Sequence, residues 1–481
     1  MTSLLPSHED VTLTTAMRVP PLYADEQDEL NRLLTQWTAK KTRNLLRAAY
    51  YDGKNAVNTI GISTPPNFRN VATVLGWPAK AVDVLNRRCN LDGFVIPGGS
   101  AADLGIPEMW ADNNLDGESP QWGISSLIHS CAFIVTTRGD TEAGEPPVVL
   151  TGRDALSSTG IWEPRRRVIR SFLSIIATDE AGGPTEMVMY LPGGNVFMTN
   201  TGRVWRVERR EHSLGRVPVE LLPYQPRLGR PFGSSRISRA VMSLTDSALR
   251  TVIRSEVSAE FYSAPQRYLL GADEKAFQDA NGNVKTQWQA IIGRIWAIDR
   301  DEDGEVPTVG QFPQSSQQPH MDQLRAWAQL FAGETSIPVS SLGISSEANP
   351  ASAEAYHASR EDLIQEAEGV TDAWGPAYCR AILTGIQLRD ELDEIPAEFR
   401  ALRAKWRNPA TPSRAAAADA GLKTIQAFPW IAETEVGLEM MGFDQPTVDR
   451  LLAERRRLNG AQALRAITEA AQRGAPGVAE Q

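Results

Sequence analysis

The residues of this 481-residue chain that could perform chemistry form no recognisable catalytic or metal-binding arrangement. The five histidines are scattered and the three cysteines lie far apart without a CxxC pair, which argues against a zinc site and a disulfide framework. His129 and Cys131 lie two residues apart in an apolar segment, so on a strand they would share one face, as a nucleophile and its base could. No third group that could orient such a base is evident, so a buried histidine beside a buried cysteine is the favoured interpretation.

One acidic run imitates a calcium site. Asp299, Asp301, Asp303 and Gly304 match the start of an EF-hand loop, but Gly310 occupies the position that must supply a bidentate carboxylate. An acidic hairpin tip explains the run better. No GxxxxGK[ST] phosphate loop, GxSxG elbow, HExxH pair or Rossmann glycine pattern occurs in the sequence. We therefore expect no metal, no cofactor and no ATP-driven motor.

The charge balance limits how the chain could contact nucleic acid. Lys and Arg number 49 against 59 Asp and Glu, a formal net charge of -10. Because phosphate contacts favour a basic surface, this chain either ignores DNA or surrounds it without gripping it. The length predicts two to four domains. No apolar stretch is long enough for a membrane span, and the N-terminus does not resemble a signal peptide, which favours a cytoplasmic origin.

The first half of the chain has the pattern of mixed α and β structure. Helices are predicted from Ala24 to Tyr50 and from Val71 to Arg88, followed by a short strand at Gly93–Ile96. Turn residues then separate further predicted strands, at Phe133–Thr137, Val168–Ile176, Met187–Leu191, Val204–Arg209 and Val217–Leu222.

The second half is dominated by helices around a small insert. Ser234 or Ser235 is expected to cap a helix of about 28 residues, roughly 42 Å long, that ends at Ser263. Its predicted apolar stripe is Ile237, Val241, Leu244, Ala248 and Val252, and its polar stripe is Arg239, Ser243, Asp246, Arg250, Arg254 and Ser258. Residues 265–318 are predicted to be a small α/β insert with a hairpin that pairs Arg294–Ile298 with Val306–Phe312. A second helix covers His320–Ala332. An insert between two helices implies a helical stalk whose apolar faces one chain cannot bury.

A polar loop and a third helix follow the stalk. The loop is Ser340–Asn349, and Asn349-Pro350 opens a helix to about Asp393 with a kink at Gly375-Pro376. Phe399–Trp406 is predicted to return as a strand to the first half. An Ala-rich helical region then runs from Thr411 to Leu458, and the tail from Asn459 is expected to be loosely ordered. On the third helix an acidic set at helical spacing is either a solvated face or a wall that repels phosphate: Glu354, Glu361, Gln365, Glu368 and Asp372.

The order of these elements and several local sequences resemble the portal proteins of tailed bacteriophages with long non-contractile tails. The resemblance spans roughly residues 25 to 458, and it rests on the order and spacing of its motifs, because no single one is diagnostic. The sequences that carry it are His212–Val219 with Gly233-Ser234-Ser235-Arg236-Ile237, Phe312–Phe331, Ile337-Pro338, Leu342-Gly343, Asn349-Pro350-Ala351-Ser352-Ala353-Glu354, Trp406-Arg407-Asn408-Pro409 and Met441-Gly442-Phe443.

The resemblance implies an α+β portal fold and a division of the chain. The mixed α/β wing has its N-terminal part at residues 1–234, and a small α/β clip covers 265–318. Two stem helices cover 235–264 and 319–335. The tunnel loop is 336–350, and a long kinked tunnel helix with the return to the wing is 351–410. An α-helical crown at 411–458 precedes a flexible tail at 459–481.

The resemblance also implies a function without an enzyme activity. A homo-oligomeric ring, expected to be a dodecamer, would surround double-stranded DNA at one capsid vertex for genome packaging, retention and ejection. Expected partners are the terminase large subunit, the major capsid protein, head-completion or adaptor proteins and a scaffold protein, with no membrane. The expected location is the virion, with the host cytoplasm during assembly. The alternatives are a DNA-processing hydrolase with an unrecognised carboxylate site and a capsid or adaptor protein without a channel.

Three groups of residues are expected to matter at the channel. The acidic lining is Glu354, Glu361, Glu368 and Asp372. The polar face of the stem, which either faces DNA or pairs with a neighbouring subunit, is Arg239, Arg250 and Arg254. The tunnel loop, expected to be the narrowest part, is Ser340, Ser341, Leu342, Gly343, Ile344, Ser345, Ser346, Glu347, Ala348 and Asn349.

Overall fold

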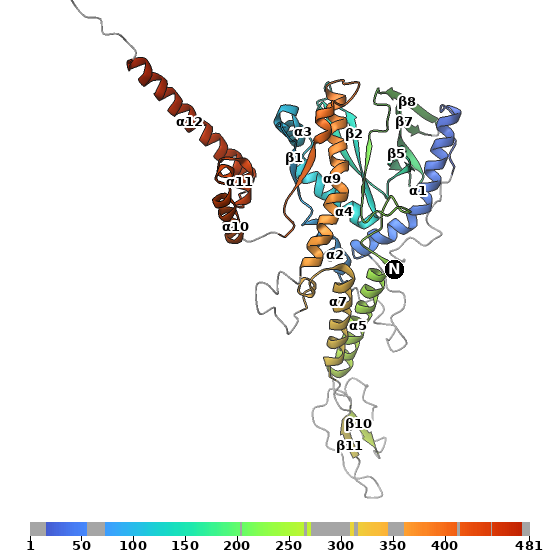
Figure 1. The fold of residues 1–481 in the computed structure, drawn as a ribbon. Helices are drawn as coiled ribbons and strands as arrows, with labels where there is room; N and C mark the ends of the chain where they lie inside the picture. Colours follow the sequence, from blue (N-terminus) through green and yellow to red (C-terminus); the bar gives the residue numbers. More distant parts are fainter. Residues whose placement is uncertain are drawn as a thin grey trace, which may run out of the picture. The chain divides into compact units, whose positions relative to one another are not determined.

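The computed structural model describes residues 16–54, 73–202, 204–263, 267–270, 308–311, 316–344, 360–410, 414–443 and 445–473 (Figure 1). The chain divides into two units. The first unit comprises Met1–Asn90 and Phe94–Ala404, and the second comprises Leu91–Gly93 and Lys405–Gln481. Each unit is described by itself.

Two antiparallel sheets form the centre of the first unit. The smaller sheet has the order β3 (Val148–Asp154), β2 (Cys131–Arg138), β9 (Val219–Pro223). The larger sheet is a meander of five strands in chain order, β4 (Ser158–Glu163), β5 (Val168–Thr178), β6 (Pro184–Leu191), β7 (Gly194–Thr201) and β8 (Val204–Glu211). The predicted strands are confirmed near their expected bounds, whereas β3, β4 and β7 were not predicted.

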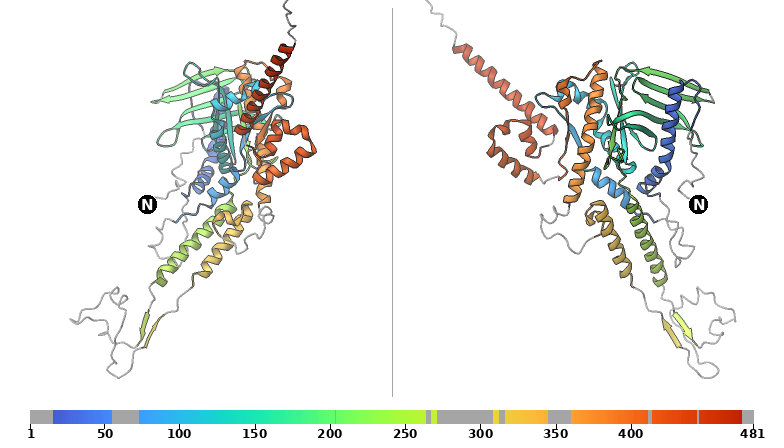
Figure 2. Two further views of the ribbon diagram at one scale, coloured as in Figure 1. Left: turned by 90° about the vertical axis from the view of Figure 1, so that its left-hand side faces the viewer. Right: turned by 45° about the vertical axis from the view of Figure 1, so that its right-hand side comes forward.

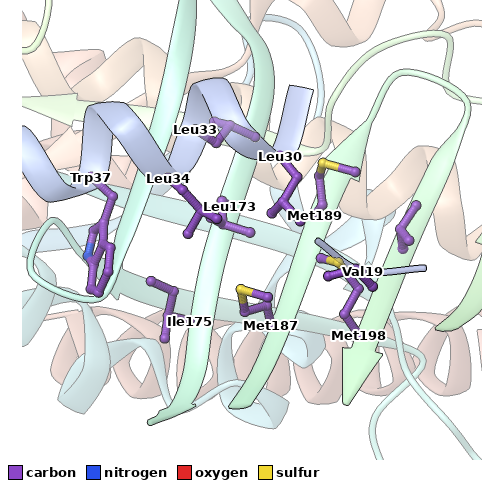
Figure 3. Close-up of a cluster of buried hydrophobic side chains, with 11 residues drawn as sticks. Val19, Leu30, Leu33, Leu34, Trp37, Leu173, Ile175, Met187, Met189 and Met198 are labelled. Atoms are coloured by element: carbon purple, nitrogen blue, oxygen red, sulfur yellow. The ribbon is translucent and has the colours of Figure 1, made fainter. Parts of the chain in front are cut away.

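Helix α1 (Ala24–Tyr51) covers the outer face of the five-stranded sheet. Because successive strand residues point to opposite faces, alternate residues of β5 and β6 point toward the helix. The resulting cluster is shown in Figure 3; it contains Val19, Leu30, Leu33, Leu34, Trp37, Leu173, Ile175, Met187, Met189, Val196 and Met198. The predicted first helix and its apolar face are confirmed.

The intervening residues of the same strands meet the three-stranded sheet. The rings of Phe133 on β2 and Phe172 on β5 have their centroids 4.8 Å apart. The opposite face of the three-stranded sheet packs against α4 (Leu115–His129) and α9 (Glu361–Arg389), where Trp122 stacks on Tyr378 at 5.9 Å. Trp374 of α9 donates its indole N–H to the carbonyl of Pro223 at 3.0 Å. The layers are therefore α1, the five-stranded sheet, the three-stranded sheet, and α4 with α9.

Two long helices of the first unit pair with each other. Figure 1 and Figure 2 show α5 (Arg239–Ser263) and α7 (Gln318–Thr335) side by side. The indole N–H of Trp327 on α7 donates to Thr251 Oγ1 on α5 at 3.2 Å. Strands β10 (Arg267–Leu270) and β11 (Thr308–Gln311), which follow α5 and precede α7, pair antiparallel. The stalk of two helices around a strand-containing insert is thus confirmed. Arg294–Ile298, the strand predicted to pair with Val306–Phe312, lies outside the described residues, and so does the acidic run that begins at Asp299.

The remaining elements are short or belong to the second unit. The first unit also contains α2 (Trp77–Asn86), η2 (Ala101–Leu104), α3 (Ile106–Asp112), η4 (Val339–Leu342) and η5 (Ala397–Ala401). Strand β1 (Leu91–Val95) pairs with β12 (Arg403–Trp406), so the predicted return of this segment to the first half is confirmed. The second unit continues with α10 (Arg414–Ala427), η6 (Pro429–Glu433), α11 (Glu435–Met440) and α12 (Gln445–Arg473).

Two helix starts differ from the predictions. The second helix begins at Trp77 rather than Val71, with the adjacent Pro78 in its first turn, where a missing N–H costs nothing. The long helix begins at Arg239, and the hydroxyl of Ser238 accepts from the amide of Val241 at 3.2 Å. Ser235 does not cap this helix, because its buried hydroxyl donates to Ile128 O at 2.6 Å.

Two further findings bear on the sequence analysis. His129 and Cys131 do not lie on one strand, which was the condition for their sharing a face: α4 ends at His129, Ser130 adopts a left-handed φ of 85°, and β2 begins at Cys131. The Ala-rich helical region does not end at Leu458, because α12 continues to Arg473. The sequence there is rich in Ala, Arg, Gln and Leu, whose intrinsic helix propensity is high even where no face of the helix is packed.

Candidate functional site

Three acidic residues and one glutamine lie together on an exposed face of α9. Glu361, Gln365, Glu368 and Asp372 are all exposed, whereas the intervening Ala367 is buried. Apart from a hydrogen bond from the Gln365 amide to Glu361 at 3.2 Å, the structure pairs none of these acids with a cation in the described part of the chain. The shared face is confirmed for these members, and Glu354 lies outside the described residues.

The predicted polar loop is described only at its start. Val339–Leu342 forms a 3-10 turn, and Gly343 follows with φ 77°, a left-handed conformation that suits glycine. Ser340 and Gly343 are exposed, whereas Ser341, Leu342 and Ile344 are half-buried. The predicted members Ser345, Ser346, Glu347, Ala348 and Asn349 lie outside the described residues.

The three arginines predicted to form the polar face of the stem occupy different environments. Arg239 is exposed, whereas Arg250 is half-buried and donates to Ser247 Oγ at 2.9 Å. Arg254 is also half-buried, and within the described residues its buried Nε has no hydrogen-bond partner. Of these three arginines, only Arg239 is fully exposed.

The apolar stripe predicted for α5 is correct at its start and wrong further on. Ile237, Val241 and Ala248 are buried as predicted, but Leu244 and Val252 are only half-buried. The far half of the helix instead buries a different set against Leu75: Leu249, Ile253 and Val257. The buried face turns because the helix meets a segment that is remote in sequence.

A buried arginine joins several elements where α5 begins. Arg236 donates its Nε to the carbonyl of Ala81 on α2 and its Nη2 to the carbonyl of Thr335 at the end of α7, each at 2.6 Å. Its Nη1 contacts the Glu366 carboxylate of α9 at 2.5 Å and Tyr224 Oη, just after β9, at 2.9 Å. Tyr224 also donates its hydroxyl to the same carboxylate. We call this set the Arg236 node.

The charges in the Arg236 node compensate each other. The Arg236 side chain is only 2% exposed and that of Glu366 is 17% exposed. Burial alone would lower the pKa of Arg236, but Tyr224 and Glu366 raise it, so the guanidinium keeps its charge. Burial raises the pKa of Tyr224 well above its ordinary value, so the phenol remains a donor. Charge-assisted hydrogen bonds of this kind are short and strong.

A second buried carboxylate links β9 to α9. Glu220 accepts from Arg380 Nε at 2.6 Å and from Arg216 Nη1 at 3.1 Å, and Arg216 also donates to Thr384. Burial raises the pKa of Glu220, and the two guanidinium groups oppose that rise. We call this set the Glu220 node. It has the same chemistry as the Arg236 node but contains no residue of α5 or α7.

The possible nucleophile and base have the properties of core residues. His129 and Cys131 are both buried, as the favoured interpretation predicted. Burial raises the pKa of the Cys131 thiol to about 11, so it is protonated at neutral pH. Across the described ranges, no group of three or more His, Cys, Asp or Glu side chains could hold a metal ion. The same part of the chain also contains no helix with the length and apolar character of a bilayer span.

The sequence reasoning missed both buried nodes. Arg236 and Arg216 lie in two of the motifs that carry the family resemblance. Arg216 has apolar neighbours, which indicate burial, but Arg236 stands among serines and a second arginine and gives no such signal. Their partners Glu366 and Glu220 lie 130 and 4 residues away along the chain. The distant partner has no local signature, because Glu366 is one of several acids on the same helix.

Comparisons with known proteins give consistent results. The family model described as "Phage portal protein, SPP1 Gp6-like" matches residues 30–446. The portal protein of Mycobacterium phage D29 is 27% identical over 449 residues, covering 92% of this chain and 89% of the relative. The portal protein of Mycobacterium phage L5 is 26% identical over 381 residues, covering 78% and 77%.

Similar solved structures come from gene transfer agent particles. One is the neck of a native particle computed with C12 symmetry, with 13% identity, a TM-score of 0.42, and coverage of 76% of this chain and 89% of that chain. Another is the virion of a native particle, with 15% identity, a TM-score of 0.41 and the same coverage.

Proposed function

The chain belongs to the phage portal protein family, and we propose that it forms the ring through which viral DNA passes at one capsid vertex. As a member of this family it is a head-tail connector protein. The family is structural rather than enzymatic, in agreement with the prediction that the chain is not an enzyme. The hydrolase alternative is therefore set aside.

The observation that carries the proposed channel is the acidic face of α9. Its exposed carboxylates have no cationic partner within the described residues, and the whole chain has a net charge of -10. At separations within the Debye length, about 8 Å at physiological salt, such a face repels phosphate. We propose that Glu354, Glu361, Glu368 and Asp372 line a channel that lets DNA slide because nothing holds it.

The proposed assembly is a homo-oligomeric ring of twelve subunits. On α7, Met321 is 46% exposed and Leu330 is 55% exposed, and such apolar surface favours burial against a neighbour. In a ring each subunit presents two different patches to its two neighbours. In this proposal α5 and α7 form the stem, β10 and β11 belong to the clip, α9 is the tunnel helix, and α10 to α12 form the crown.

We further propose the partners that such a ring requires. A terminase large subunit would supply the ATP-driven force, and head-completion or adaptor proteins would later occupy the clip. The major capsid protein and a scaffold protein would surround the wing during assembly in the host cytoplasm. Arg239 would contact DNA or a neighbouring subunit, since it is the stem arginine that the protomer leaves exposed.

Imaging the purified protein tests the ring directly. Negative-stain microscopy together with mass photometry should show closed rings with a central channel, at a mass close to twelve times 52.7 kDa. A stable monomer at all protein and salt concentrations would contradict the proposal. Rings without an open centre would instead favour the capsid or adaptor alternative.

Deleting the proposed tunnel loop tests the conduit. Removing residues 341–348 should leave ring assembly nearly intact, because the helices supply the packing, yet impair packaging or retention of DNA. The measurement is the length of DNA held in particles that carry wild-type or shortened rings. Genomes of equal length, held equally well in both particles, would show that the segment is only a connector.

A further inference from the structure

The Arg236 node connects the two stem helices to α9. Arg236 lies three residues before the first residue of α5, and Thr335 is the last residue of α7. Glu366 lies on the second turn of α9. A single guanidinium therefore holds the near ends of three helices that the proposed function assigns to the stem and the tunnel helix.

The Arg236 node fixes the directions of its hydrogen bonds as well as their lengths. A guanidinium is planar, so its N–H groups point in fixed directions, and here three nitrogens contact acceptors on α2, α7 and α9. Two neighbouring contacts hold the same region: Ser238 Oγ donates to Glu334 at 3.2 Å, and the rings of Trp77 and Phe331 lie 5.3 Å apart. A rotation of α9 against the stem would break at least one of these charged contacts.

We propose that Arg236, through its pair with Glu366, is the positioning residue that sets the orientation of α9 against the stem helices. The acidic face of α9 and Glu366 belong to the same helix, so the node also sets where Glu361, Glu368 and Asp372 point. The inference rests on the proposed function, because it assigns the node a role in placing the channel wall.

The Glu220 node is the matched control for this role. Its Glu220 carboxylate is buried between two guanidinium groups and also holds α9, but against β9 and with no residue of α5 or α7. If the Arg236 node merely stabilised the fold, weakening either node would have the same consequences. If it positions α9 against the stem, only changes in the Arg236 node would alter that orientation.

The experiment measures the separation of α5 and α9 in the full-length protein. Spin labels are placed at the exposed positions Ser243 and Gln365, since the three native cysteines are buried, and labelled protein is diluted with unlabelled protein. Distances are compared by electron double resonance in wild type, Glu366→Gln, Arg236→Lys and Glu220→Gln. Thermal unfolding and the retention of DNA in complemented particles are measured on the same variants.

We expect Glu366→Gln and Arg236→Lys to broaden the distance distribution and to lower the fraction of particles that retain DNA. Lysine keeps the positive charge but lacks the planar N–H donors of the guanidinium group, so Arg236→Lys should not show the wild-type distance distribution. Glu220→Gln should lower the unfolding temperature yet keep a narrow distribution. If Arg236→Lys fails to fold, Glu366→Gln alone decides, because it changes one carboxylate to an amide of the same shape.

A narrow wild-type distribution in Glu366→Gln would overturn the proposal, and so would equal broadening in Glu220→Gln. Failure of this inference can be distinguished from failure of the proposed function. The label distance does not require a ring or DNA, whereas a wild-type protein that forms no ring would refute the channel and leave the node's mechanical role measurable.

Discussion

Acidification should destabilise this protein through His129. His129 is the last residue of α4, is 6% exposed, and has a buried Nδ1 without a hydrogen-bond partner in the described part of the chain. Burial lowers its pKa from 6.5 to about 4, while Asp154 partly opposes and Arg47 reinforces the shift. A cation at a helix C-terminus would normally be favoured, so desolvation outweighs the helix dipole here.

The sign and size of the effect follow from proton linkage. Because the pKa of folded His129 lies below the unfolded value of 6.5, the unfolded chain binds more protons between these values. The stabilising contribution is complete above about pH 6.5 and is lost as the pH falls toward 4. A shift of one pKa unit is worth about 1.4 kcal/mol, so the free energy of unfolding should fall by about 3 kcal/mol per chain at pH 4.

The assay compares unfolding temperatures of wild type and His129→Gln at a fixed protein concentration over this pH range. Glutamine has no proton to gain, so the variant should lose less stability on acidification, and the two curves should converge as the pH falls. His212→Gln is the control, because His212 is only half-buried and burial lowers its pKa too. Parallel curves for wild type and His129→Gln would refute the reasoning.

Three further predictions test packing, the channel wall and the absence of catalysis. Gly123→Ala should cost about 1–3 kcal/mol in unfolding free energy, because the new Cβ would lie 2.3 Å from Asn86 Oδ1 and 3.1 Å from the buried indole ring of Trp374. Gly193→Ala has open space around the new Cβ and should be nearly neutral, and chemical denaturation checks both variants. Replacing Glu361 and Glu368 by Lys should slow DNA passage and increase the salt dependence of ejection. Glu211→Lys, on the edge strand β8, should not, and equal effects would count against the acidic wall. Purified protein should hydrolyse neither ATP nor DNA, and turnover that survives repurification and disappears with a point mutation would contradict this.

Local patterns in the sequence determined much of the architecture. Leu30, Leu33, Leu34 and Trp37 recur at helical spacing, and that alone predicts α1 and its buried face. The two stalk helices and the strand-containing insert between them follow from the same kind of evidence. The acidic face of α9 was also visible, because Glu361, Glu368 and Asp372 are spaced for one side of a helix. These features depend on neighbours within a few turns, which the sequence displays directly.

Other features were decided only by the tertiary structure. Their spacing alone would allow His129 and Cys131 to share one face of a strand, yet a helix ends and a strand begins between them at Ser130. Helix α5 buries Leu249 and Ile253 against Leu75, a contact that no periodicity within the helix could indicate.

The Arg236 node shows the physical reason most clearly. Arg236 and Glu366 are 130 residues apart, and their sequence neighbourhoods contain other arginines and other acids of equal local character. Whether a charge is solvated or buried against a partner depends on how the layers pack, since burial costs several kcal/mol per ion and only a well-placed partner offsets that cost. That choice is made by contacts between distant segments, so it appears only when the chain is folded.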